Sequence, residues 1–195
     1  ANRKRYETSV KAPMHAFVAE MIGRVARLDP QVRIEPKDAI FRINRDIRFS
    51  KDKTPYKLST SALISPGGRK DMDTPGLYFE LGPEAVRIYG GRYMPDRQQL
   101  QKIREHIMAH HGVFRKLYSA KDFVSRFGSI QGERNKVLPA DLKAAAEKEP
   151  LLYNKQFYFA AELPPGTIKD PELPEVMMAY YRAMRPMNAF LMGKA

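Results

Sequence analysis

Residues 77–89 read LYFELGPEAVRIY, and this stretch decides the fold class. Two runs in which apolar and polar residues alternate, Leu77–Leu81 and Ala85–Tyr89, flank the pair Gly82-Pro83. Alternation with a period of two is typical of strands, and Gly-Pro is typical of turns. The stretch therefore predicts a β-hairpin with a slightly long turn.

More extended segments precede this hairpin. Residues 58–64 are predicted to form a strand that ends at the turn-forming residues 65–68, and further strands are predicted at 32–34 and 41–49. Consecutive strands without helices between them favour an antiparallel or mixed sheet over alternating βαβ units. The sequence therefore predicts a single α+β domain over residues 1–195, with a sheet of at least four strands packed by helices.

Helices are predicted on both sides of these strands. Residues 14–28 have the three-and-four spacing of one buried helix face, which Asp29-Pro30 ends. In the second half of the chain we expect helices from Asp96, at 113–118 and at 138–148, and a strand within 151–163. A last helix should begin near Pro174 and end at Pro186, because proline breaks a helix interior.

The chain is basic, and its charge is concentrated near the start. Its 195 residues carry a formal net charge of +12, of which residues 1–57 hold +7. Such an excess implies negatively charged partners, with a merely solvated basic surface as the alternative. A hydrophobic content of 43% excludes a disordered chain, and the lack of cysteine excludes disulfides, cysteine-bound metals and thiol nucleophiles. Without a long apolar run or a signal peptide, we expect a soluble, cytoplasmic protein with no membrane partner.

Arg45 occupies an unusual place in the predicted strand 41–49. The odd-numbered positions of that strand put Arg45 on one face with four large apolar residues, Phe41, Ile43, Ile47 and Phe49. An unpaired guanidinium there would cost several kcal/mol in lost hydration, so we expect Arg45 to be buried and paired. Its partner is either a carboxylate from another element or an anionic ligand that the planar guanidinium binds through two hydrogen bonds.

A basic loop follows directly. Residues 50–57 read SKDKTPYK and place Lys51, Lys53 and Lys57 next to Arg48. Loops between rigid strands often carry binding residues, and neighbouring cations add their potentials. The alternative is an ordinary solvated basic loop.

The motifs around this loop resemble those of a known family. RINRDIRFSKDKTPYK at 42–57, PGLY at 75–78 and GGRYMP at 90–95, followed by Leu100 and Ile103-Arg104, resemble the domain of unknown function 2461 family of bacteria and fungi in the same order. The resemblance covers nearly the whole chain and implies one α+β domain, but no activity. Family members have a segment with an aromatic pair upstream of Ala1-Asn2-Arg3, so the resemblance implies that part of the N-terminal segment is missing here.

Catalytic and metal motifs are weak. His106 and His110 share a helix face, but they lack a third ligand and the order of a zinc protease motif. Asp46 and Asp52 are the best carboxylates for acid–base chemistry, yet neighbouring cations should lower their pKa values, which suits ionised structural partners. Gly90-Gly91 is expected to allow a bulge that directs Arg92 and Tyr93 off the strand end.

The sequence therefore favours a module that binds an anionic, phosphate- or carboxylate-bearing small molecule. The alternatives are an enzyme that uses the same cations with Asp46 or Asp52, a nucleic-acid-binding module, and a cluster that only braces the fold. No cofactor or metal is predicted, and the sequence does not give the oligomeric state. The candidate ligand-binding residues are Arg45, Arg48, Lys51, Lys53, Tyr56, Lys57, Arg92 and Tyr93.

Overall fold

The hairpin expected at residues 77–89 is present and supplies the two middle strands of a four-stranded sheet. β2 (Leu77–Leu81) and β3 (Val86–Arg92) are joined by a turn in which the Gly82 N–H donates to the Ala85 carbonyl at 3.1 Å. β1 (Thr60–Ile64) pairs antiparallel with β2, with Thr60 opposite Leu81. β4 (Phe157–Leu163) completes an antiparallel sheet of order β1-β2-β3-β4. The expected α+β class is thus confirmed.

The computed structural model describes residues 2–194, which group into two compact units. The first unit comprises residues 2–72, 77–88 and 162–179, and the second comprises 73–76, 89–161 and 180–194. β3 and β4 each contribute residues to both units. The expected extent of one domain over 1–195 stays a prediction. No helix formed by the described residues is long and apolar enough to span a membrane.

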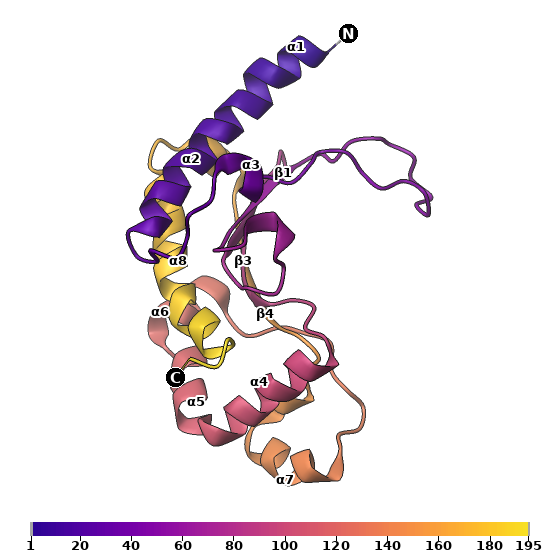
Figure 1. Cartoon of the computed structure of the whole chain (residues 1–195), viewed down its shortest axis with the longest axis vertical. Helices are drawn as coiled ribbons and strands as arrows, with labels where there is room; N and C mark the ends of the chain where they lie inside the picture. Colours follow the sequence, from indigo (N-terminus) through magenta and orange to yellow (C-terminus); the bar gives the residue numbers. More distant parts are fainter. Residues whose placement is uncertain (1, 195) are drawn as a thin grey trace. The chain divides into compact units, whose positions relative to one another are not determined.

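A long N-terminal helix dominates the first unit (Figure 1). It runs through α1 (Arg3–Tyr6), a π-helical segment η1 (Glu7–Lys11) and α2 (Ala12–Ala26), so it begins well before the predicted residue 14. Its buried face consists of Met14, Val18, Met21 and Val25. Phe17 packs edge-on against Phe79 of β2, with ring centroids 5.6 Å apart. Residues 3–13 stay exposed or half-exposed, which leaves this part of the helix available as the wall of a surface site.

The strands expected at 32–34 and 41–49 are absent, and these predictions are wrong. Residues 31–35 lead without strand pairing into the short helix α3 (Pro36–Ala39). Residues 41–59, which we call the arm, project from the rest of the first unit as two irregular limbs (Figure 1). The limbs pair at an isolated bridge between Asn44 and Tyr56, and the Arg45 N–H donates to the Pro55 carbonyl at 2.9 Å. A regular ladder does not extend past this point because Pro55 has no N–H to donate.

Helices make up most of the second unit. They are α4 (Arg97–Ala109), α5 (His111–Tyr118), α6 (Lys121–Phe127), α7 (Ala140–Lys148) and the 3-10 turn η3 (Pro150–Tyr153). The start of α4 is the expected one, since the Asp96 side chain caps it by accepting from the Gln99 N–H at 2.8 Å. Phenylalanine rings form the core, among them Phe114, Phe157 and Phe159, which are fully buried.

The last helix, α8 (Leu173–Phe190), continues through Pro186, so the prediction that this residue ends it is wrong. Packing and hydrogen bonds beyond the proline explain the difference. Met187 and Phe190 are buried, and the Asn188 Oδ1 accepts from the Gly91 N–H at 2.8 Å. These interactions outweigh the single helical hydrogen bond that proline removes.

Candidate functional site

Arg45 is held inside the arm. Its Nη1 donates to the carboxylate of Asp52 and to the hydroxyl of Thr54, and its Nη2 lies 3.5 Å from the Ser50 Oγ. The side chain is 28% exposed, and the partner carboxylate comes from the same arm. The expected ion pair between Arg45 and a protein carboxylate is therefore present, with Arg45 half-buried. The partner does not come from another element, as expected, because the limbs turn back on themselves and bring Asp52 to Arg45.

The two aspartates of the arm are ionised structural partners, in the direction that the sequence predicts. The hydrogen bond from Arg45, followed by those from Thr54, lowers the pKa of Asp52 from 3.8 to about 2. Arg48 binds Asp46 through two hydrogen bonds of 3.0 and 2.6 Å and lowers the pKa of that carboxyl. Both groups therefore carry a negative charge at neutral pH, and neither holds a proton to donate.

The tip of the arm, residues 45–54, is otherwise largely exposed. The Lys53 Nζ donates to the Ile47 carbonyl at 2.9 Å, while Lys51 extends into solvent. Phe49 is 94% exposed, so its expected place on an apolar face is wrong. The Arg48 guanidinium lies 5.9 Å from the centre of its ring. Three of the four cations of the tip, Arg45, Arg48 and Lys53, therefore already donate hydrogen bonds to oxygen atoms of the arm itself.

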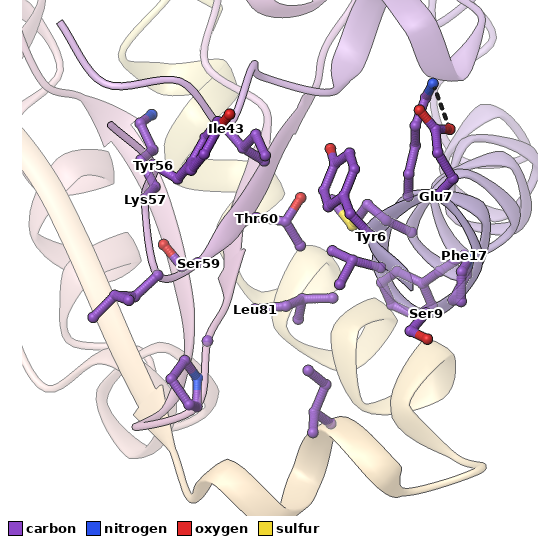
Figure 2. Close-up of a pocket in the computed structure, with 18 of the residues that line it drawn as sticks. Tyr6, Glu7, Ser9, Phe17, Ile43, Tyr56, Lys57, Ser59, Thr60 and Leu81 are labelled. Atoms are coloured by element: carbon purple, nitrogen blue, oxygen red, sulfur yellow. Dashed lines mark hydrogen bonds and ion pairs between the residues drawn. The ribbon is translucent and has the colours of Figure 1, made fainter. Parts of the chain in front are cut away.

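A groove in the first unit offers a different arrangement. It has a volume of about 1460 Å³ and lies between the N-terminal helix and the base of the arm (Figure 2). The helix contributes residues from Arg3 to Phe17, the arm contributes 42–44 and 56–59, and β1 and the β2–β3 turn lie between them. The 3-10 turn η4 (Pro165–Lys169) closes one side. We call this feature the cationic groove.

Charge in the cationic groove is unbalanced. Five cations and one carboxylate line it, namely Arg3, Lys11, Arg42, Lys57, Lys169 and Glu7. Glu7 is already bound to Lys11 at 2.9 Å. Among residues 2–194, none of the four remaining cations has a carboxylate within 4.0 Å. All four line one concave surface, so their potentials add.

Two tyrosines face each other across this groove. Tyr6 extends from the helical wall, and Tyr56 lies with Lys57 on the wall formed by the arm, with Thr60 and Leu81 between them (Figure 2). Tyr56 is 56% exposed and Tyr6 is half-buried. Neither ring packs against another aromatic ring of the described part of the chain. Within residues 2–194, the groove therefore presents two tyrosine rings that do not stack on another aromatic ring, beside cations that lack a carboxylate within 4.0 Å.

Of the candidate residues predicted from sequence, the structure places Arg45, Arg48, Lys51 and Lys53 at the arm tip, and Tyr56 and Lys57 in the groove. Arg92 and Tyr93 belong to the second unit, where Arg92 is 7% exposed with its Nη1 3.0 Å from the Met192 Sδ. The Tyr93 ring packs edge-on against Tyr158, with centroids 5.2 Å apart.

Sequence reasoning missed Arg3, Arg42 and Lys169. Arg42 lies on the polar face of the predicted strand, and its adjacency to the basic loop was the available signal. Arg3 and Lys169 come from segments distant in sequence that only the fold brings to the groove. No local pattern could have identified them.

The two histidines noted in the sequence pack against each other. The rings of His106 and His110 are 4.5 Å apart, and His106 also contacts Phe190 at 4.5 Å. Burial, followed by the nearby His110, lowers the pKa of His106. Within residues 2–194, no group of three or more potential ligand residues is arranged to hold a metal ion.

Comparison with known proteins identifies one family. Residues 1–190 match the family model described as a conserved hypothetical protein, DUF2461. No curated protein and no solved structure matches the chain.

Proposed function

The chain belongs to the DUF2461 family, and we propose that it is a non-catalytic module that binds a phosphate- or carboxylate-bearing ligand in the cationic groove. The observation that carries the proposal is the set of four groove cations without a carboxylate partner, Arg3, Arg42, Lys57 and Lys169. A cytoplasmic location, expected from the sequence, is part of the same proposal.

Electrostatics supports the groove over the arm tip as the binding site. At the tip, Arg45 and Arg48 already bind aspartates, so an incoming anion would have to displace Asp52 or Asp46. In the groove, like charges repel one another until an anion enters, and the concave surface focuses their field. Arginine and lysine also form charge-assisted hydrogen bonds with phosphate and carboxylate oxygens.

The enzyme alternative has less support. General acid–base catalysis at neutral pH works best with a group whose pKa lies near 7. The pKa values of Asp46 and Asp52 are shifted downward by their arginine partners, away from that range. The binding proposal uses the same cations and needs no proton transfer.

Calorimetric titration tests the proposal. Tripolyphosphate serves as the phosphate probe and citrate as the carboxylate probe, with wild type and an Arg42→Ala, Lys57→Ala variant. We expect the variant to bind the preferred probe at least about tenfold more weakly, because hydrogen bonds to charged groups contribute about 1.5–3 kcal/mol each.

A charge-matched control separates the groove from the overall basic charge. Lys143→Ala, Lys148→Ala removes two exposed lysines of α7, in the second unit, and should leave the affinity unchanged. Equal binding by all three proteins, or no binding by wild type, would contradict the proposal.

A further inference from the structure

We infer that the ligand of the cationic groove is a single strand of nucleic acid whose bases stack on Tyr6 and Tyr56. This inference rests on the proposed function and narrows it to one class of anion. It is carried by three observations on the groove: its size, its two tyrosines that pack against no other aromatic ring of the described residues, and the cations that line it.

The groove is large for a small molecule. Pockets for small ligands usually have volumes of about 300–1,000 Å³, whereas this one has about 1460 Å³. Its helical wall, from Arg3 to Phe17, is about 20 Å long at roughly 1.5 Å per residue. A stacked strand advances about 3.4 Å per nucleotide, so the wall matches about six nucleotides. An extended polymer therefore fills this groove better than a metabolite.

The aromatic rings favour nucleic acid over other extended anions. Tyr6 and Tyr56 lie on opposite walls of the groove, Tyr6 half-buried and Tyr56 exposed (Figure 2). Proteins that bind single strands without sequence preference combine basic grooves with such rings, because every base has a π face. An acidic peptide would use the cations but would leave both rings without stacking partners.

The cations line the same groove as the rings. Arg3 lies one helical turn before Tyr6, and Lys57 directly follows Tyr56, so each ring has a cation on its own wall. Arg42 on the arm and Lys169 on η4 extend the charge along the groove. Cations and rings in one groove suit a strand that carries both phosphates and bases. A duplex covers the faces of its bases by stacking each base pair on the next, so the geometry points to an unpaired strand.

Fluorescence anisotropy with three labelled probes tests the inference. The probes are a 12-residue oligothymidylate, an abasic deoxyribose-phosphate 12-mer of equal charge, and a 12-base-pair duplex. We expect wild type to bind oligothymidylate about 30-fold more tightly than the abasic strand, since each stacked base contributes several-fold in affinity. The duplex should bind no better than the abasic strand.

Substitution of the rings provides the decisive variant. Tyr6→Leu, Tyr56→Leu keeps the apolar bulk and the charge but removes the stacking faces. It should lower affinity for oligothymidylate to that for the abasic strand and leave abasic binding unchanged. Tyr153→Leu, in the second unit, is the matched control and should retain the full preference. Circular dichroism spectra of both variants check that they are folded.

The outcomes separate this inference from the proposed function. If wild type binds the two single strands equally and Arg42→Ala, Lys57→Ala weakens both, then anion binding stands and base stacking is overturned. If wild type binds none of the probes, nor tripolyphosphate or citrate, both are overturned. A groove occupied by a second copy of the chain would appear as a doubled mass in light scattering without oligonucleotide, and would also overturn the inference.

Discussion

Arg45 and Asp52 join the two limbs of the arm, and their ion pair sets the protonation of the aspartate. Substitution of Arg45 by alanine removes the main cause of the lowered pKa of Asp52, so this pKa should rise from about 2 towards its ordinary value of 3.8. NMR titration of the carboxyl carbon measures the change. Arg48→Ala is the matched control, since it should raise the pKa of Asp46 and leave that of Asp52 unchanged.

The same pair makes the stability of the arm dependent on pH. The pKa of Asp52 is lower in the folded chain than in the unfolded one, so its stabilising effect is fully present above about pH 4 and is lost as pH falls through about 2. In Arg45→Ala this acid-dependent loss should be smaller. An unchanged pKa of Asp52 in that variant would contradict the assignment of the pair.

Gly91 is required by its backbone conformation and by a close contact. Its φ is +85°, and a Cβ atom there would lie 2.1 Å from the Phe157 carbonyl oxygen. We expect Gly91→Ala to lower the free energy of unfolding by about 2–4 kcal/mol, measured by urea denaturation.

A second glycine is the control for this effect. Gly23 is exposed in the last turn of α2, and nothing lies within 4 Å of the Cβ that alanine would add. Gly23→Ala should stabilise the chain by about 0.5–1 kcal/mol, because glycine is a poor helix former. Equal effects of the two substitutions would contradict the account of Gly91.

At the scale of elements, the sequence predicted what local patterns determine. β2 has the expected bounds because its alternation and the Gly82-Pro83 turn are both local signals. The arm was wrongly predicted as a strand. Its alternation is real, since Phe41, Ile43 and Ile47 are half-buried, but its backbone pairs only at isolated bridges and not with a continuous neighbouring strand. Strand formation depends on a partner, which a single segment does not reveal.

At Pro186 the prediction failed because tertiary packing outweighed a local signal that normally ends a helix. Its ring is exposed on α8, and it cannot donate an N–H to the carbonyl four residues earlier. Pro186→Ala should therefore stabilise the chain by about 1–3 kcal/mol and raise Tm by several degrees in a thermal melt. Pro174→Ala, in the first turn of the same helix, should leave Tm nearly unchanged, since proline costs little there. A lower Tm for Pro186→Ala would mean that proline is favoured by the local geometry.

At the scale of the whole molecule, the anionic partner that the sequence predicts stays a proposal, and the candidate residues chosen from the sequence include only part of the cationic groove. The excess of +7 in residues 1–57 lies in the unit that holds the cationic groove, because the N-terminal helix and the arm supply most of its lining. It could not show that the arm tip neutralises its own arginines, since that depends on how the limbs fold back. Nor could it show that Arg3 and Lys169, which are more than 160 residues apart in the sequence, line the same surface.

The salt dependence of binding distinguishes a local site from the diffuse effect of a net charge of +12. For single strands, the logarithm of the binding constant falls with the logarithm of salt concentration with a slope of about −0.7 per neutralised phosphate. If Arg3, Arg42, Lys57 and Lys169 each contact one phosphate, oligothymidylate should show a slope of about −2.8.

Two double variants with the same net charge then give different slopes. Arg42→Ala, Lys57→Ala should reduce the slope to about −1.4, because two of the four phosphate contacts are lost. Lys143→Ala, Lys148→Ala also removes two positive charges, but they lie outside the groove, in the second unit. Screening limits their influence to roughly 8 Å at physiological ionic strength, so this control should keep the wild-type slope. Anisotropy titrations over a salt series measure all three slopes, and equal slopes for the two variants would mean that affinity follows total charge and not the groove.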